Sequence, residues 1–185
     1  MTTPATPRAL RTRARVLDAA LDLFERQGYD GTTVAQIAAA AGITPMTFFR
    51  HFPTKDAVLV SDPYDPLLAE AVAAQPRDLP AVERVRRGML AALGTIEPVE
   101  HATAVRRVRL VAASPALRAA VVLATYDTER AITDALVDDG VPHLDAAVAA
   151  AACLGACTAA LFAMPADADL GAVVTRALDV LGETP

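Results

Sequence analysis

The chain has 185 residues, of which 54% are hydrophobic and 21% are charged, so it is long enough to bury a core and too apolar to be disordered overall. Its net charge of −5 is unevenly divided, because residues 1–55 carry a net +3 and the following 130 residues carry a net −8. A basic head on an acidic body indicates that the N-terminal part binds an anion. An arginine-rich disordered tail would give the same charge, and residues 8–15 taken alone fit either interpretation.

Helical patterns dominate from the N-terminus onwards, and the sequence contains no convincing alternating strand. The first apolar stripe has the i, i+3, i+4, i+7 spacing of a buried helix face, and Gly28 follows it where a left-handed C-terminal cap is expected. The stripe consists of Leu17, Ala20, Leu21 and Phe24.

Two short helices are predicted next. A Thr-x-x-Gln capping box starts the second helix at Thr33, and Gly42 follows its last apolar residue. Thr44 is the predicted N-cap of a third helix, with Pro45 in its first turn and Pro53 at its end.

The rest of the chain is also predicted to be helical. A fourth helix begins at Thr54 or Lys55 and is kinked or interrupted by Asp62, Pro63 and Pro66. Further helices are expected at about 79–95, 98–113, 115–138, 143–164 and 168–182. The sequence therefore predicts an all-α protein of about nine helices, with an N-terminal domain over residues 1–53 and a helical body over residues 54–185. Residues 1–10 are expected to form a disordered arm.

Residues 33–52 have the pattern of a helix-turn-helix, because two short helices are joined by three or four residues that include a glycine. The second helix of such a motif lies in the major groove of DNA. Helical spacing directs Phe48 and Phe52 towards the core of this domain. The N-terminal domain is therefore predicted to bind DNA.

The opposite face of the third helix carries side chains that suit base edges. Arg50 can donate two hydrogen bonds to a guanine, and Thr47 and Met46 can contact thymine methyl groups, with His51 at the edge of this face. The two predicted N-cap threonines stand at helix N-termini, where backbone N–H groups favour a phosphate.

The segment RARVLDAALDLFERQGYDGTTVAQIAAAAGITPMTFFRHFPTKDAVL, residues 13–59, resembles the DNA-binding region of the TetR family of bacterial regulators. The resemblance includes an LF-x-x-x-GY turn, a TTV-x-x-IA-x-x-AG second helix and an RHFP-x-K ending. The total length and the number of expected helices are also similar to those of the family, whereas the body resembles it in architecture only.

The resemblance implies contacts with double-stranded DNA. It places phosphate contacts at Thr33, Thr44, His51 and Lys55, and base contacts at Pro45, Met46, Thr47 and Arg50. Two positions depart from the family pattern: Phe49 replaces a usual tyrosine whose hydroxyl reaches a phosphate, and Met46 replaces a frequent glycine or small residue. Two of these residues also have an interpretation without DNA contact. Lys55 can be a solvated surface lysine, and His51 can be an ordinary histidine at the edge of a helix.

By the same resemblance, the body senses a small molecule and forms a homodimer in which the last two helices pack against their copies. The alanine-rich helix at 143–164 suits such an interface, and the core of a monomer is the alternative. Ala146–Met164 is uncharged over 19 residues, which is long enough to span a membrane. Its flanks carry aspartates rather than basic anchors, so an interface helix is preferred and no membrane partner is expected.

Several residues of the body have both a chemical and a structural interpretation. Cys153 and Cys157 share one helical face without further metal ligands nearby, so they are expected to be buried, inert thiols. The candidates for an effector pocket are Met89, His101, Arg109, Tyr126 and Phe162, although amphiphilic packing accounts for them as well.

The predicted function is that of a cytoplasmic repressor, which binds a palindromic operator as a homodimer and is released by a small-molecule effector of unknown identity. No cofactor or metal is expected. An enzyme is not expected either, because the sequence has no nucleophile elbow, phosphate-binding glycine loop, zinc-ligand cluster or dinucleotide fingerprint. A helical interaction module that has lost DNA binding is the alternative function. The N-terminal arginines are not followed by an apolar stretch, so no secretory signal is expected.

Overall fold

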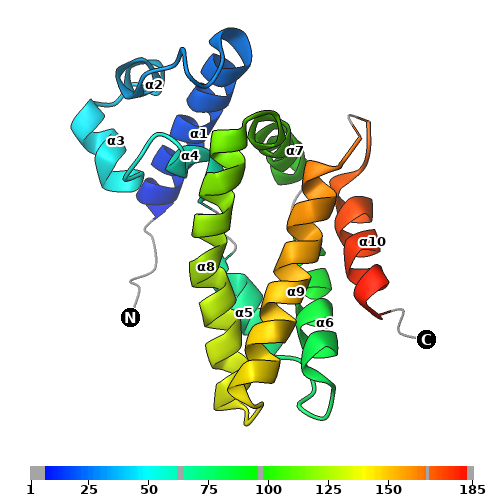
Figure 1. Cartoon of the computed structure of the whole chain (residues 1–185). Helices are drawn as coiled ribbons and strands as arrows, with labels where there is room; N and C mark the ends of the chain where they lie inside the picture. The colour runs from blue at the N-terminus through cyan, green and yellow to red at the C-terminus, as the bar shows by residue number, and fades with distance from the viewer. Residues whose placement is uncertain (1–6, 62–64, 96–97, 166, 183–185) are drawn as a thin grey trace. The chain divides into compact units, whose positions relative to one another are not determined.

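The computed structural model describes residues 7–61, 65–95, 98–165 and 167–182 (Figure 1). Every regular element within these ranges is a helix, and they number ten, which confirms the predicted all-α class. The chain divides into two compact units, residues 1–61 and residues 62–185. We expected the boundary after residue 53. The first unit extends beyond that point to residue 61 and includes the short helix α4 (Ala57–Val60).

The first unit contains α1 (Pro7–Gln27), α2 (Val34–Ala40), α3 (Pro45–His51) and α4 (Ala57–Val60). Helix α1 begins at Pro7, so residues 7–10, which we expected in a disordered arm, are helical. Proline suits the first position of a helix because the N–H that it lacks would have no partner there. Residues 1–6 of the expected arm lie outside the described residues.

The core of the first unit joins all four of its helices. Leu21, Phe24, Ile37, Phe48 and Leu59 are buried. Helical spacing predicted this burial for Leu21, Phe24 and Phe48. Gly28 directly follows α1 and Gly42 follows the C-cap of α2, and both have a left-handed backbone, at φ 79° and φ 64°. This confirms the predicted C-terminal caps.

The predicted fourth helix is two separate elements, which explains why the described residues contain ten helices rather than nine. Helix α4 ends at Val60, and its C-cap Ser61 has an extended backbone, at φ −71° and ψ 122°. Helix α5 (Asp65–Ala73) then begins the second unit. The break that we expected at Asp62 and Pro63 falls on residues outside the described ranges.

The second unit contains α5, α6 (Ala81–Leu93), α7 (Pro98–Ala113), α8 (Pro115–Asp138), α9 (His143–Phe162) and α10 (Leu170–Gly182). The ends of α6 to α10 lie within two residues of the predicted ends. Helices α8 and α9 run antiparallel beside each other, and α6 and α10 pack against α9 (Figure 1).

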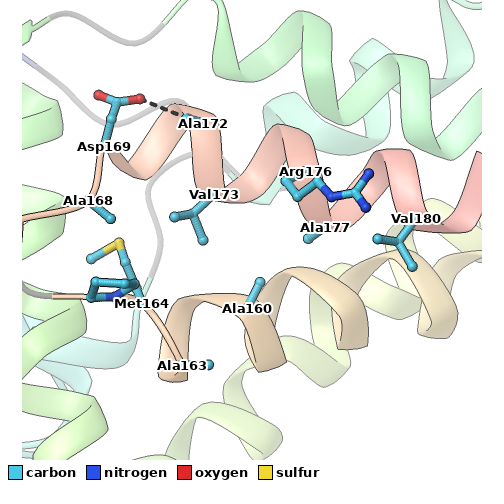
Figure 2. A pocket seen from close by; sticks show the side chains of 11 residues that line it. Ala160, Ala163, Met164, Ala168, Asp169, Ala172, Val173, Arg176, Ala177 and Val180 are labelled. Carbon is cyan, nitrogen blue, oxygen red and sulfur yellow. Dashed lines mark hydrogen bonds between the residues drawn. The ribbon is translucent and has the colours of Figure 1, made fainter.

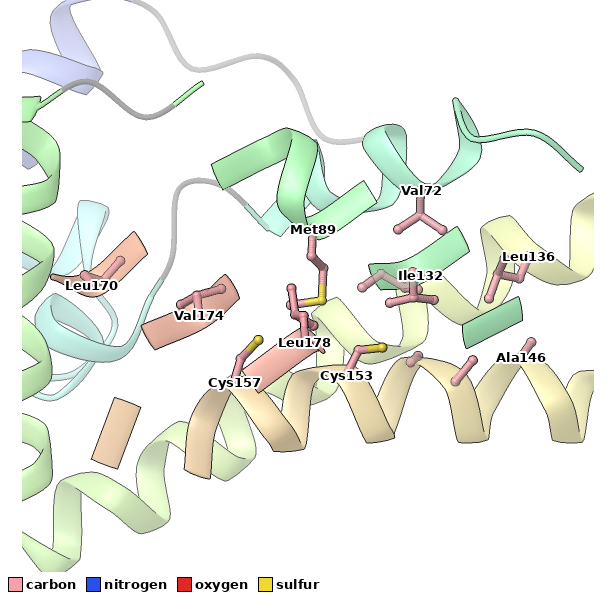
Figure 3. Close-up of a cluster of buried hydrophobic side chains, with 13 residues drawn as sticks. Val72, Met89, Ile132, Leu136, Ala146, Cys153, Cys157, Leu170, Val174 and Leu178 are labelled. Atoms are coloured by element: carbon pink, nitrogen blue, oxygen red, sulfur yellow. The ribbon is translucent and has the colours of Figure 1, made fainter. Parts of the chain in front are cut away.

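Small side chains from α9 fill the centre of the second unit. Ala146, Ala149, Cys153 and Cys157 face a cluster of buried apolar residues from α5, α6, α8 and α10 (Figure 3). Helices α5 and α6 also approach closely. A Cβ atom at Gly88 would lie only 2.7 Å from the Cα atom of Val72. Alanine and glycine therefore set the short distances between these helices.

An arginine lies within this unit without access to solvent. Arg84 of α6 is 0% exposed, and its Nη2 atom donates a hydrogen bond of 2.5 Å to Asp139 at the end of α8. Arg77 also binds the Asp139 carboxylate, at 2.6 Å. The hydrogen bond from Arg84 is the main reason why the pKa of Asp139 lies below its ordinary value. The Nε and Nη1 atoms of Arg84 have no partner among the described residues.

Helix α9 has the length and composition of a membrane span, with a mean hydropathy of 1.8. Helices α7 and α8 are long and apolar enough for a membrane span only when they are taken as one segment, although they are bent by 118° at the break between them. One face of α9 is nevertheless part of the protein core, since Ala146, Ala149, Ala150 and Cys153 are fully buried there. Core helices of soluble proteins have the same composition.

Candidate nucleic-acid interface

Helices α2 and α3 are each started by a threonine. The Thr33 hydroxyl accepts a hydrogen bond of 3.2 Å from the Gln36 N–H, and the Gln36 side chain accepts one of 2.8 Å from the Thr33 N–H. The Thr44 hydroxyl accepts a hydrogen bond of 3.2 Å from the Thr47 N–H and lies 3.0 Å from the Thr47 hydroxyl. The predicted capping box and the predicted N-cap are confirmed.

Helix α3 separates its core face from its solvent face as the helical spacing predicts. Phe48 and Phe52 are buried, whereas Met46 is 83% exposed and Phe49 is 53% exposed. The Phe49 ring meets the Phe48 ring edge-on, with centroids 5.5 Å apart. Pro45 and Arg50 are exposed and Thr47 is half-buried, so the residues expected to contact bases are accessible.

Two arginines of α1 hold α3 and the preceding turn in place. Arg13 donates a hydrogen bond of 2.6 Å to the carbonyl oxygen of His51, and its guanidinium carbon lies 4.3 Å from the centroid of the Phe52 ring. Arg15 donates to the carbonyl oxygen of Ala41, in the turn before α3. Sequence reasoning missed these contacts, because they join residues that lie 38 and 26 positions apart.

His51 lies at the edge of the solvent face of α3, which we call the reading face, and is half-buried. Burial lowers the pKa of its imidazole below the ordinary value of 6.5, and the positive charges of Arg50 and Arg13 lower it further. The imidazole is therefore neutral at neutral pH. It can donate a single hydrogen bond to a phosphate but adds no positive charge to the surface.

The ammonium group of Lys55 is hydrogen-bonded to the backbone and is not freely solvated. Its Nζ atom donates hydrogen bonds to the carbonyl oxygens of Tyr29, at 2.7 Å, and Thr32, at 3.0 Å. The same atom lies 4.0 Å from the centroid of the Tyr29 ring. Because an ammonium group has three donors, one remains for a phosphate. The sequence pattern gave no sign of this attachment to the turn between α1 and α2.

A polar hollow of about 700 Å³ lies beside α3 within the first unit. Its lining combines one face of α1 with the turn before α3 and with the exposed side of α3 itself. The lining residues are Arg8, Arg11, Thr12, Arg15, Gly42, Ile43, Thr44, Thr47 and Arg50. Three of the expected DNA-contacting residues thus share this hollow with three arginines of α1, which sequence analysis counted as charge but did not assign to a site.

The five residues considered for an effector pocket occupy different environments. Met89 is buried in the core cluster, where Figure 3 shows it beside Leu178. Tyr126 is 63% exposed and Arg109 is also exposed, while His101 and Phe162 are half-buried. These positions place the five residues on four helices, from α6 to α9.

A shallow apolar pocket of about 460 Å³ lies elsewhere in the second unit, between the end of α9 and α10 (Figure 2). Ala160, Met164, Val173 and Val180 contribute to its lining, with Arg176 among them. None of the five candidate residues lines this pocket.

Both cysteines are buried, as expected. Burial raises the pKa of Cys153 to about 11 and that of Cys157 to about 12. Thiols of this kind carry almost no thiolate at neutral pH and are poor nucleophiles.

The chain is similar to known proteins over both units. Residues 16–61 match the family model described as bacterial regulatory proteins of the tetR family, and residues 79–184, more than half of the chain, match the MftR C-terminal domain. The HTH-type transcriptional regulator TcmR of Streptomyces glaucescens is 37% identical over 116 residues, which are 59% of this chain and 51% of TcmR. The chain thus spans about half the length of this relative.

Solved structures share the fold over nearly the whole chain. SmeT, the repressor of the Stenotrophomonas maltophilia multidrug efflux pump SmeDEF, is 25% identical with a TM-score of 0.56, over 91% of this chain and 87% of SmeT. A TetR-family regulator from Streptomyces coelicolor A3 is 20% identical with a TM-score of 0.54, over 98% of this chain and all of its own. Since family models match the helix-turn-helix unit and most of the second unit, the chain belongs to the TetR family of bacterial regulatory proteins.

Proposed function

We propose that this chain is a cytoplasmic repressor, which binds a palindromic operator as a homodimer and releases it when a small molecule binds. The observation that carries the proposal is the solvent face of α3, where Met46, Phe49 and Arg50 are exposed on a helix anchored by two buried phenylalanines. A short helix that presents its side chains on a rigid base is what major-groove recognition requires. Repression is supported by the similarity to SmeT, which is itself a repressor.

The proposed DNA contacts divide into two groups. Arg50, Thr47, Met46 and Pro45 read base edges, because they occupy the exposed side of α3. Phosphate oxygens are bound by Thr33, Thr44, His51 and Lys55, with Phe49 beside them in place of a tyrosine. The exposure of Thr33 and Thr44 and the free donor of Lys55 support this division.

The proposed dimer interface is the outer face of the last two helices. On α9, the side opposite the core carries an apolar stripe that begins at Leu144, 73% exposed, and Val148, 55% exposed. Exposed alanines and Gly155 continue it, and α10 adds Val180, 56% exposed. Because these residues are uncharged, and small along much of α9, a second copy of the helices can approach closely and remove the stripe from water.

The proposed effector site lies in the second unit among α7, α8 and α9, which pack against one another. His101, Arg109, Tyr126 and Phe162 belong to these helices and combine polar groups with apolar surface, and Met89 of α6 completes the proposed set. An apolar effector with one or two polar groups fits such a combination.

Selection of bound fragments from randomised DNA tests the proposal directly. The full chain should enrich a sequence with two inverted half-sites, and a gel shift with the selected fragment should show one complex whose protein-to-DNA ratio is two to one. Enrichment of no sequence, together with no shift of any duplex, would instead identify the chain as an interaction module without DNA-binding activity.

A further inference from the structure

Three arginines of α1 share one face of that helix. Arg8, Arg11 and Arg15 stand at positions i, i+3 and i+7, which bring their side chains above one another. Together with Arg50 of α3 they line the polar hollow described above. Residues 8–15 all lie within the helix, and seven steps of about 1.5 Å make the row about 10 Å long.

Four guanidinium groups therefore line one polar hollow. In the part of the chain that the structure describes, none of the four forms an ion pair with a carboxylate. Arginines of the second unit behave differently, since Arg84 and Arg86 each bind a carboxylate. The acidic residues of α1 all come after Arg15, towards the other end of the helix. Like charges that line one hollow repel one another unless an anion lies between them.

One of the four arginines also holds the hollow in shape. Arg15 donates to the Ala41 carbonyl oxygen, which fixes α1 against the turn before α3. That turn contains Gly42, and a Cβ atom at this position would lie 3.6 Å from the Nη2 atom of Arg15. Arg8 and Arg11 are exposed, and their side chains remain available for a ligand.

We propose that this hollow binds the phosphate backbone of the operator beside the groove that α3 reads, with Arg8 and Arg11 as phosphate ligands and Arg15 as the residue that positions them. The inference rests on the proposed function and adds α1 to its DNA-contacting elements. A guanidinium group can bind a phosphate through two parallel N–H···O hydrogen bonds. The two proposed ligands are three residues apart, about 4.5 Å along the helix, which is comparable to the rise of about 3.4 Å per nucleotide of one strand. Contacts of this kind strengthen binding to every sequence alike.

The test compares the full chain with two double variants that lose the same charge. R8Q/R11Q removes the two proposed ligands. R26Q/R118Q is the matched control, because Arg26 lies in the last turn of α1, about 22 Å along the helix from Arg11, and Arg118 is exposed in the second unit. Thermal unfolding first establishes that all three proteins fold alike. Dissociation constants are then measured against salt concentration, with the selected operator and with an unrelated duplex of equal length.

We expect R8Q/R11Q to reduce the slope of log K against log salt by about 1.8 per protomer, which is about 0.9 for each lost phosphate contact. The loss should be equal on both duplexes, and the control should retain the slope of the unchanged chain. Equal slopes for R8Q/R11Q and R26Q/R118Q overturn the inference while leaving the proposed function intact. A loss that depends on the sequence beside the half-sites overturns it too, since the arginines would then read a groove. If the unchanged chain binds neither duplex, the proposed function fails as well.

A second measurement separates backbone phosphate from a free anion. Inorganic phosphate is titrated into each protein at constant ionic strength, and the melting temperature is followed. Stabilisation of the unchanged chain but not of R8Q/R11Q, combined with equal salt slopes on DNA, would assign the hollow to a free anion and overturn the DNA assignment.

Discussion

The ammonium group of Lys55 lies against Tyr29 in two ways, with its nitrogen 2.7 Å from the tyrosine carbonyl oxygen and 4.0 Å from the centre of the ring. A second carbonyl oxygen, from Thr32, accepts another of its hydrogen bonds. The lysine therefore joins the segment after α3 to the turn between α1 and α2, in addition to its proposed contact with a phosphate.

Lys55→Ala should therefore reduce both stability and DNA binding. The loss of two charged hydrogen bonds should cost about 1–3 kcal/mol of unfolding free energy, measured by urea unfolding. Tyr29→Leu is the matched variant, because it keeps both carbonyl oxygens and removes only the ring, at a cost of about 0.5–1 kcal/mol for the cation–π contact in addition to the loss of ring packing. A Lys55→Ala protein as stable as the unchanged chain, but with weakened DNA binding, would show that the lysine serves only as a phosphate ligand.

Arg50→Ala should relax specificity at one base position of each half-site. The side chain is exposed on the reading face, and a bidentate contact with guanine contributes about 1–3 kcal/mol of discrimination. Binding to the selected operator and to single-base variants of it should be compared by fluorescence anisotropy. A uniform loss across all variants would instead mean that Arg50 contacts a phosphate.

Phe49→Tyr should tighten binding by about 0.5–1.5 kcal/mol, because a hydroxyl at the edge of the exposed ring can donate to a phosphate. The ring is 53% exposed and rests edge-on against Phe48, so the hydroxyl fits without repacking the core. The measurement is the dissociation constant on the operator, with Phe49→Leu as the control that lacks the hydroxyl. A changed base preference in Phe49→Tyr would place residue 49 over the bases and contradict this assignment.

Glu83 should make the second unit sensitive to acid. Hydrogen bonds from Arg86 and Arg87 lower the pKa of its carboxyl from 4.5 to about 2, and Arg86 also binds Asp179 of α10 at 3.0 Å. Because the folded pKa is the lower one, the stabilisation is complete above about pH 4.5 and is lost as the pH falls towards about 2. The difference in unfolding free energy between the unchanged chain and Glu83→Gln should therefore shrink over this range. A difference independent of pH would show that the ion pairs contribute nothing measurable.

Gly155→Arg should convert the proposed dimer into a monomer. A Cβ at this exposed position would meet no atom within 4 Å, so the folded protomer accommodates the arginine, whereas a partner helix on the α9 stripe would not. Ala119→Arg on the exposed side of α8 adds the same charge away from the stripe and should leave the dimer intact. Sedimentation velocity measures both. A dimeric Gly155→Arg protein would place the interface elsewhere.

Local patterns predicted the elements of this fold well. Capping residues at Thr33 and Thr44 and glycines at 28 and 42 determine where the helices of the first unit begin and end, and such signals involve only neighbouring residues. The start of α1 was missed, because the run of arginines after Pro7 resembles a solvated tail in sequence alone. In the structure, Arg13 and Arg15 of that run bind the carbonyl oxygens of His51 and Ala41.

The site was predictable only where helix periodicity governs it. Spacing along α3 distinguishes Phe48 from Arg50, so the exposed reading face followed from the sequence. The hollow beside it could not follow, because it forms only when α1 packs against the turn at Gly42. Arg84 illustrates the same limit in the second unit, since nothing in its surrounding sequence indicates that Asp139, 55 positions away, neutralises it in the core.

The burial of Cys153 and Cys157 has a practical consequence for observing this protein at work. These are the only two cysteines in the chain, and their raised pKa values, about 11 and about 12, leave them protonated and unreactive towards maleimides at neutral pH. A cysteine placed on the surface of the first unit, for example by Arg26→Cys, would then be the one thiol in each protomer that accepts a dye or spin label. The native sequence therefore permits the distance between the two first units of the proposed dimer to be measured in solution, with and without a candidate effector, without first removing any natural residue from the core.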